Sequence, residues 1–554
     1  MPRLTTTSID VARLSEIDRL AERELADTGL PGLAIGLTGP HGPPEVRTYG
    51  LADLAARRPV EPDTLFEIGS IGKTFTAIAI VQLIEEGRLG LDAPVVDALP
   101  WFELPIVGRP ITIHDLLTHT AGIISGIDGT PEAAFQVWAL RDRRPGSAPG
   151  KRFHYSDLGY KALGLVIEAV EGRPYPDVVR TRILEPLGMT ATEPAITHDI
   201  RSRLAVGYAF LHDDRIGYPR RPIAPATWVE TATADGAIAS TAGDMAAFAR
   251  MLLRRGEGPG GRLVSEAAFA RMAEPHARPT PDYGYGYGLA TRVLGGRTFL
   301  GHGGDMIGYQ SALQVDPTAG LAVVVLQNGL MGNPMTLARA VLVAVGGPQG
   351  GGGSASGAPS ASGDHRDPGA PADGASGPDR AGLYRAGPDH ADSEPLEITT
   401  GPAGPHLRWR GRSLALEALG DGRFLAPDPD LDRYALRFEP AEEAPVSVWH
   451  GPTRFVRDGA TMPPLPAPDP AVAAVAGHYR SHNPWTTNFR VILRGDVPWL
   501  VFPTADEEPL VPRPDGSFRV GDDPEGPEDL RFDAVVDGRP LRAWLSGFPY
   551  YRVG

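Results

Sequence analysis

A long stretch of low-complexity sequence, residues 347–380, interrupts this chain and limits how it can fold. Its composition is dominated by Gly, Ser, Ala, Pro and Asp, as in the run GGGGSASGAPSASG. Such a segment carries too few apolar side chains to form a core, so we expect a disordered linker. With 554 residues the chain is also too long for one ordinary domain. We therefore expect a first domain at residues 1–346 and further domains after residue 380.

Apolar runs near both ends of the first domain have the length and pattern of β-strands. They comprise residues 33–37 and 46–50, on either side of the turn sequence GPHGPP, and residues 298–300, 310–315 and 321–326. Residues 335–345 predict a helix after the last strand. This order favours an α/β (α+β) domain in which one antiparallel sheet is built from both ends of the domain. A helical region is then inserted between the two groups of strands.

The segment from Thr64 to Ile84, TLFEIGSIGKTFTAIAIVQLI, combines a short extended run with an apolar helix. Ser70 and Lys73 stand three residues apart at the start of that helix, so both side chains lie on one face of its first turn. A serine there is close to the exposed N–H groups of the helix, and an adjacent amine can take its proton. This spacing is typical of a nucleophile and its base.

Three other interpretations apply to the same segment. The sequence GKT at 72–74 looks like the end of a phosphate-binding loop, but that loop needs glycine where Glu67 stands. A G-x-S-x-G elbow needs glycine two residues before the serine, where Ile68 stands. The third is a plain helix cap by Ser70 with Lys73 in solvent. The segment alone leaves the cap and the nucleophile evenly balanced.

Polar residues at two later places add to this pair. The sequence Tyr-Ser-Asp at 155–157 precedes a helix predicted over about 158–170. Its tyrosine and carboxylate are either a core aromatic and a cap or a polar pair in a cleft. His302 has glycines on both sides, and small residues in a strand let a ligand approach the backbone closely. His114 and His119, in a short helical segment, are expected to be structural.

In order along the chain, Ser70-Ile-Gly-Lys73, Tyr155-Ser-Asp157 and His302-Gly-Gly304 resemble the three motifs of the penicillin-recognising serine hydrolases. That family includes class C β-lactamases, D-Ala-D-Ala carboxypeptidases, D-aminopeptidases and esterases of the same fold. The resemblance covers about residues 10–346 and extends to the flanking sequences LLTHTAG, GAIASTAGDM and LGHGGDMIGYQS. It implies a β-lactamase/transpeptidase-like catalytic domain, and it decides against a plain cap at Ser70.

The resemblance implies a role for each matching residue. Ser70 is expected to be the nucleophile that forms an acyl-enzyme, with Lys73 and Tyr155 sharing the general base and acid work. Because an unperturbed phenol has a pKa of about 10, this mechanism needs a cation beside Tyr155. The oxyanion hole is expected to be the backbone N–H groups of Ser70 and Asp305. His302 completes the catalytic set. The residues implied to contact the substrate are Asp157, Gly303 and Gly304.

Two residues depart from the usual pattern of that family. The third motif usually begins with lysine, a permanent cation, whereas His302 is mostly neutral at pH 7. The second motif often ends in asparagine, whereas Asp157 would repel a substrate carboxylate and favour an ammonium. We therefore expect a hydrolase of D-aminoacyl amides or peptides, with a carboxylesterase as the alternative. A β-lactamase or D-Ala-D-Ala carboxypeptidase ranks third, and a non-catalytic sensor of this fold is the alternative from another class of protein.

The part of the chain after the linker contains an internal repeat. Ala381-Gly-Leu-Tyr-Arg385 recurs as Ala476-Gly-His-Tyr-Arg480, and the sequences DGRF/DGSF and LRF recur at matching spacing. Short alternating strands with Asp-Gly turns predict a small antiparallel β-barrel for each copy. We expect these barrels at residues 381–460 and 475–554, in structural or substrate-gating roles. A catalytic domain followed by two barrels resembles bacterial D-aminopeptidases, in which a barrel loop restricts the active site.

Composition limits the partners of the chain. A net charge of −15 argues against binding to nucleic acid or to an anionic membrane. The absence of cysteine excludes disulfides and thiol catalysis, and no metal or other cofactor is expected. Residues 1–29 form a charged amphipathic pattern without the apolar core of a signal peptide, and no apolar run is long enough to span a membrane. We expect a soluble cytoplasmic enzyme that acts on a small molecule or short peptide, and the oligomeric state stays open.

Overall fold

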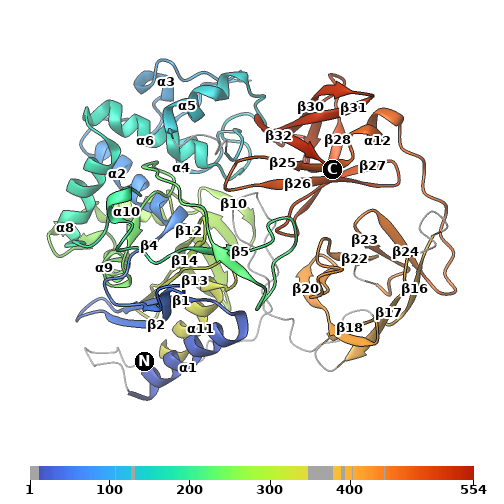
Figure 1. The fold of residues 1–554 in the computed structure, drawn as a ribbon. Helices are drawn as coiled ribbons and strands as arrows, with labels where there is room; N and C mark the ends of the chain where they lie inside the picture. Colours follow the sequence, from blue (N-terminus) through green and yellow to red (C-terminus); the bar gives the residue numbers. More distant parts are fainter. Residues whose placement is uncertain are drawn as a thin grey trace. The chain divides into compact units, whose positions relative to one another are not determined.

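A computed structural model describes residues 11–105, 108–126, 132–346, 379–387, 393–401, 404–441 and 443–554 of the chain. These residues form two compact units (Figure 1). The first contains the chain up to Phe210 and from Pro219 to the end of helix α11, and the second contains Leu211–Tyr218 and the strands after residue 379. Of the expected linker, 347–380, all but the last two residues lie outside the described residues.

The first unit is built on an antiparallel sheet whose strands come from both ends of its sequence. Within the described residues the sheet has nine strands, in the spatial order β10-β11-β12-β13-β14-β15-β1-β2-β3. Their bounds are Gly32–Thr38 (β1), Glu45–Asp53 (β2), Arg58–Pro59 (β3), Ala277–Thr280 (β10), Tyr283–Tyr285 (β11), Ala290–Leu294 (β12), Arg297–Met306 (β13), Tyr309–Asp316 (β14) and Leu321–Gln327 (β15). β1 pairs with β2 on one side and with β15 on the other. The predicted sheet is therefore confirmed.

The helices of the first unit flank the sheet or lie between β3 and β10 in the sequence. They are Val11–Thr28 (α1), Gly72–Glu85 (α2), Val95–Ala98 (α3), Ile113–Leu117 (α4), Ala133–Trp138 (α5), Asp157–Glu171 (α6), Tyr175–Val179 (α7), Glu185–Leu187 (α8), Ala242–Leu253 (α9), Glu266–Ala273 (α10) and Pro334–Gly346 (α11), with 3-10 turns at Gly69–Ile71, Ala139–Asp142 and His198–Ile200 and a π-helical turn at Arg180–Leu184. Three short strand pairs join Phe66–Glu67 (β4) to Ala239–Ser240 (β7), Tyr208–Phe210 (β5) to Ile223–Pro225 (β6), and Glu257–Gly258 (β8) to Gly261–Arg262 (β9). In the part of the chain that is described, no helix has both the length and the apolar composition needed to cross a membrane.

Apolar side chains bury both faces of the sheet. Leu33 and Ile35 of β1 pack with α1 and α11 on one face. Ala34 of β1 and Val324 of β15 join the larger core on the other face, together with α2, α6 and α9. Because successive side chains of a strand point to opposite faces, a strand covered on both sides is apolar throughout. This arrangement places α2, with Ser70 at its head, against the same side of the sheet as α9.

The second unit contains both copies of the internal repeat. The strands of the first copy are Gly382–Ala386 (β16), Leu396–Gly401 (β17), Gly404–Trp409 (β18), Arg412–Ala415 (β19), Glu417–Gly420 (β20), Arg423–Leu425 (β21), Leu436–Glu439 (β22), Ser447–His450 (β23) and Thr453–Arg457 (β24). Helix α12 (Pro470–Val475) precedes those of the second copy, which are Gly477–Arg480 (β25), Asn488–Arg494 (β26), Val497–Val501 (β27), Glu507–Pro512 (β28), Phe518–Val520 (β29), Asp529–Val536 (β30), Arg539–Leu545 (β31) and Phe548–Val553 (β32). The strands of the second copy close into a barrel, β25 pairing with β32.

Matching residues of the two copies make the same contacts. Tyr384 and Tyr479 are fully buried, and each donates its hydroxyl hydrogen to the carbonyl oxygen four residues earlier, at 2.9 and 2.8 Å. Arg457 and Arg552, in the last strand of each copy, donate to the carbonyl oxygen of the alanine just before the first strand. The sequence repeat is thus also a structural repeat.

The first copy differs from a closed barrel at one strand. β28 pairs with β27 through its first half and with β29 through its second half. In the first copy the corresponding stretch is divided at Leu416 into β19, paired with β18, and β20, paired with β21. A closed barrel is therefore seen in the second copy, whereas the described strands of the first form a nine-stranded sheet whose end strands are consecutive in sequence. The prediction of two barrels is corrected to one closed barrel and one interrupted at Leu416.

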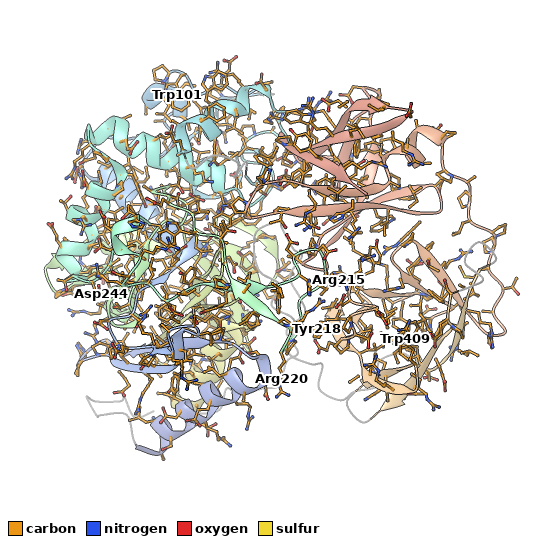
Figure 2. The ribbon with its side chains drawn as sticks, viewed as in Figure 1. Trp101, Arg215, Tyr218, Arg220, Asp244 and Trp409 are labelled. Atoms are coloured by element: carbon orange, nitrogen blue, oxygen red, sulfur yellow. The ribbon has the colours of Figure 1, made fainter. Side chains whose placement is uncertain are left out.

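The segment Leu211–Tyr218 lies between β5 and β6 in the sequence but belongs to the second unit. Ile216 is buried in an apolar cluster with residues of both repeat copies, namely Leu425, Ala435 and Ala505. Arg215, labelled in Figure 2, donates a hydrogen bond to the carbonyl oxygen of Pro429. Its neighbours form ion pairs with the second copy, Asp213 with Arg480 at 2.5 Å and Asp214 with Arg490 at 3.1 Å. This short segment therefore packs where the two repeat copies meet.

Candidate active site

Ser70 lies at the start of α2, as its sequence predicts. The turn Gly69–Ile71 leads directly into the helix, and Ser70 is partly exposed whereas the helix behind it is buried. Gly69 has a φ of +53°, a left-handed conformation that favours glycine. A Cβ on Gly69 would also lie 2.4 Å from the backbone nitrogen of Asp305. Glycine at this position therefore allows Ser70 to stand next to strand β13.

Lys73 is fully buried, and its ammonium group faces three oxygen atoms. Its Nζ lies 2.8 Å from Ser70 Oγ and 2.8 Å from the carbonyl oxygen of Asp235. Oδ1 of Asp157 lies 2.6 Å from the same Nζ. An ammonium has three N–H donors and no acceptor, so these three oxygens match its full donor capacity. The arrangement fits a charged Lys73 that donates a hydrogen bond to Ser70.

Tyr155 is buried between this ammonium and a histidine. Lys73 Nζ lies 4.9 Å from the centroid of the Tyr155 ring, and the ring of His119 lies 4.3 Å away between centroids. Nδ1 of His119 accepts a hydrogen bond of 3.0 Å from the backbone N–H of Ser156. Burial lowers the pKa of His119 well below its ordinary value, so the ring is neutral. His119, which the sequence assigns to a structural role, therefore supports the ring of Tyr155 and the backbone of Ser156, the next residue.

His302 lies on β13 and is almost fully buried. Its Nδ1 is 2.6 Å from the carbonyl oxygen of Gly303, which can only accept, so Nδ1 carries a hydrogen. Its Nε2 is 2.9 Å from the hydroxyl of Tyr285. Burial raises the pKa of Tyr285 well above its ordinary value, so this hydroxyl stays protonated and can donate to Nε2. These contacts fit a neutral imidazole.

The second half of strand β13 lies beside the turn that carries Ser70. In the described residues β12 pairs with only the first half of β13, whereas β14 pairs along most of it. Residues 302–306 therefore have a strand on one side, and the turn before α2 lies along the other. A Cβ on Gly304 would stand 1.9 Å from the carbonyl oxygen of Ile68. This close packing brings the backbone of Asp305 next to the segment that carries Ser70.

Asp157 has a different partner from the one expected of it. From the sequence, we expect it to face a substrate ammonium. In the structure its carboxylate forms an ion pair with Lys73. The two glycines expected at the substrate site also differ from each other. Gly304 is required by its contact with Ile68, whereas a Cβ on Gly303 would meet no atom closer than 3.8 Å. Packing within the chain would therefore tolerate a Cβ at position 303 and does not require glycine there.

Two charged residues that the sequence did not single out complete the surroundings of Lys73. Asp235 supplies the carbonyl oxygen that Lys73 contacts, and its carboxylate Oδ2 lies 3.6 Å from Nζ of Lys161. Lys161 is four residues after Asp157 on α6 and is buried. The available signal was a lysine within the apolar pattern LGYKALGLVIE, because a buried ammonium needs a partner.

The described residues offer no metal site. No three His, Cys, Asp or Glu side chains among them are arranged to hold an ion. Two carboxylates of this region are instead paired with lysines, Asp157 with Lys73 and Asp235 with Lys161.

Glu67, three residues before Ser70, links the stability of this region to pH. Its side chain is buried on β4, and burial raises its pKa to about 8. A carboxyl group whose pKa is higher in the folded than in the unfolded protein stabilises the fold most at pH values below its unfolded pKa. That contribution is lost as the pH rises through the folded pKa, at about 1.4 kcal/mol for each pH unit between the two values.

Replacing Glu67 by glutamine is expected to remove this pH dependence. Relative to the variant, the wild-type protein should lose several kcal/mol of stability, on the order of 1.4 kcal/mol per unit, between about pH 4.5 and pH 8. Denaturant unfolding of both proteins at pH 5, 6.5 and 8 measures the difference. Glu266→Gln, at an exposed carboxylate on α10, is the control and should run parallel to the wild type. Parallel curves for Glu67→Gln as well would contradict the prediction.

Comparisons with protein families and with known proteins show what this chain is similar to. A family model described as Beta-lactamase matches residues 17–347. Penicillin-binding protein 4 of Amycolatopsis lactamdurans is 32% identical over 286 residues, which cover 49% of this chain and 74% of that protein. Esterase EstB of Burkholderia gladioli is 34% identical over 210 residues, which cover 33% of this chain and 53% of the esterase.

A solved structure adds a relative with a stated stereochemical preference. The D-stereospecific amidohydrolase from Streptomyces sp. is 28% identical, with a TM-score of 0.50, and covers 60% of this chain and 98% of that structure. By their names, the three relatives are a penicillin-binding protein, an esterase and an amidohydrolase.

Proposed function

Because the chain belongs to the beta-lactamase family and is a serine hydrolase, we propose that it cleaves D-aminoacyl amides or short peptides through an acyl-enzyme on Ser70. The observation that carries this proposal is the neutral environment of His302, whose ring nitrogens face Gly303 O and the Tyr285 hydroxyl. A neutral ring supplies no permanent cation for a substrate carboxylate. This disfavours substrates that are held by a free carboxylate.

In the proposed mechanism Ser70 Oγ attacks the carbonyl carbon of the substrate while Tyr155, as the phenolate, takes the hydroxyl proton. Lys73 acts as the cation: it donates to Ser70 Oγ and lies against the Tyr155 ring, which favours the ionised phenol. Tyr155 then gives the proton to the leaving amine, and Ser70 keeps the acyl group. A water molecule attacks the acyl-enzyme, its proton passes through Tyr155 to Ser70, and the acid is released.

The oxyanion of each step is proposed to bind to the backbone N–H groups of Ser70 and Asp305. The close contacts of Gly69 with Asp305 and of Gly304 with Ile68 support this assignment, because they keep the two backbone segments together. Removing one such donor typically costs about 10²–10³ in rate.

The exposure of the charged side chains supports an amine-bearing substrate. Lys73 and Lys161 have side chains that are 0% and 4% exposed, whereas those of Asp157 and Asp235 are 27% and 17% exposed. The carboxylates therefore lie nearer the solvent than the ammonium groups behind them. A substrate that approaches meets negative charge first, which attracts an ammonium and repels a carboxylate. The D-configuration is proposed from the Streptomyces amidohydrolase relative.

A rate panel tests the proposal. The substrates are the p-nitroanilides of D-alanine and L-alanine, p-nitrophenyl butyrate and a chromogenic cephalosporin. We expect the D-anilide to be cleaved faster than the L-anilide, and the cephalosporin slowly or not at all. Equal rates on the two anilides, or no cleavage of either, would mean that the D-aminoacyl assignment is wrong.

A carboxylesterase is the second candidate, because the relative EstB is 34% identical over its matched region. A neutral His302 suits an ester as well as an amide. Cleavage of p-nitrophenyl butyrate without cleavage of either anilide would favour this candidate. A non-catalytic sensor would be favoured if Ser70 were not labelled by a fluorophosphonate or by a fluorescent penicillin.

Replacing Asp157 by asparagine is expected to slow hydrolysis of every substrate by about ten- to a hundredfold. The change removes the charge that faces Lys73 at 2.6 Å, and hydrogen bonds to charged groups contribute about 1.5–3 kcal/mol. An added rise in KM for the D-alanine anilide, without one for p-nitrophenyl butyrate, would indicate that Asp157 also attracts the substrate ammonium. An unchanged kcat on the ester would contradict a role through Lys73.

A further inference from the structure

A second buried lysine, Lys161, contacts the same aspartate as Lys73. Lys161 on α6 is 3% exposed. Its Nζ is 2.9 Å from Oε1 of Gln136 and 3.6 Å from Oδ2 of Asp235. A buried ammonium is costly unless it is paired and hydrogen-bonded, and the mechanism above gives this one no task.

Asp235 connects the two lysines. Its carboxylate faces Lys161, while its carbonyl oxygen is 2.8 Å from Nζ of Lys73. The next residue, Gly236, packs against the segment that carries Ser70, because a Cβ on Gly236 would lie 2.8 Å from the carbonyl carbon of Gly69. Asp235 is thus held at a fixed place beside the nucleophile.

We propose that the Lys161–Asp235 pair balances the charge around Lys73 and thereby sets the pH range in which Tyr155 acts as a base. This inference rests on the proposed function, in which Tyr155 takes the proton of Ser70. Two ammonium groups and two carboxylates meet here, and their formal charges sum to zero. Loss of either member of the outer pair leaves one uncompensated charge beside Lys73, whose ammonium lies against the Tyr155 ring. Lys161 and Asp235 are positioning residues, because they act through Lys73.

The buried tyrosines and the fully buried histidine around this cluster are neutral near pH 7. Burial raises the pKa of each buried tyrosine and lowers that of the buried histidine. The contacts of His302 fit a neutral ring, which lies 6.2 Å from that of Tyr155. The groups concerned are Tyr160, Tyr175, Tyr285, His119 and His302. Among the groups named here, the two lysines and the two aspartates carry the formal charge.

The test compares three variants: Lys161→Met, Lys161→Arg and the double variant Lys161→Met/Asp235→Asn. The readout is the rate of Ser70 labelling by a fluorophosphonate as a function of pH, which does not depend on the natural substrate. A positive charge favours the phenolate, so its loss in Lys161→Met should move the acidic limb of the profile upward by about one pH unit. Lys161→Arg keeps the charge and should leave the limb in place. The double variant restores neutrality and should return the limb to its wild-type position.

The outcomes separate an effect of the charge at residue 161 from an effect of the shape of its side chain. Equal displacement of the limb in the methionine and arginine variants, or failure of the double variant to restore it, would overturn the inference. Lys161→Gln, which keeps a donor for Gln136, repeats the test if the methionine variant does not fold. Arg254→Gln breaks the half-buried ion pair with Glu257 (2.8 Å) and is the remote control, expected to leave the limb unmoved. A wild-type protein that is never labelled would overturn the proposed function itself, whereas a labelled one with an immobile limb would overturn this inference alone.

Discussion

Replacement of Ser70 by alanine is expected to lower kcat/KM on ester and anilide substrates by about 10⁴-fold or more and to abolish fluorophosphonate labelling. The change removes the atom that carries the acyl group while Lys73 and Tyr155 keep their places. Stability should change little, because Ser70 is partly exposed at the head of a helix whose core contacts lie further along. Kinetics, intact-protein mass spectrometry after labelling and thermal unfolding together measure the effect.

The matched control is Ser265→Ala at the start of α10. Ser265 Oγ accepts the backbone N–H of Ala268 at 3.1 Å, so its loss should cost about 1 kcal/mol of stability and leave the rate unchanged. If the Ser70→Ala variant were still labelled, or if its kcat/KM fell by much less than 10⁴-fold, the nucleophile would be another residue. The two variants separate loss of chemistry from loss of a helix cap.

Much of the site was predictable because its residues stand next to strong local signals. Ser70 and Lys73 share a helix turn, Tyr155 precedes a helix, and His302 lies between glycines in a strand. These signals depend on neighbours in the sequence. The roles of the four residues came from the family resemblance. The antiparallel sheet made from both ends of the first unit was likewise predictable, because its strands are long and apolar.

What could not be predicted depends on contacts between distant residues. No local pattern reveals that Asp157 faces Lys73, or that Lys161 and Asp235 meet beside them. The same holds for the segment Leu211–Tyr218, which packs where the two repeat copies meet. The interruption at Leu416 was missed for a related reason. The sequence pattern predicts where strands occur, but not that the residues before Leu416 pair with β18 and those after it with β21.

Replacement of Lys73 by methionine is expected to lower kcat by about 10³-fold or more, because the phenol of Tyr155 loses the cation that favours its ionised form. It should also destabilise the fold. Asp157 would lose the ammonium 2.6 Å away, which we expect to cost about 1–3 kcal/mol, less than a fully buried pair because its side chain is 27% exposed. The stability loss and the rate loss therefore have different causes.

The double variant Lys73→Met/Asp157→Asn separates these two causes. Without the carboxylate there is no uncompensated charge, so the unfolding midpoint should return towards that of the wild type, whereas kcat should stay low. Denaturant unfolding and single-turnover acylation, measured on the same preparations, give both quantities. Recovery of the rate together with the stability would mean that Lys73 serves only to neutralise Asp157. Recovery of neither would mean that the ion pair does not stabilise this region. Recovery of stability alone would show that the Lys73 ammonium is needed for catalysis and that its ion pair with Asp157 stabilises the fold.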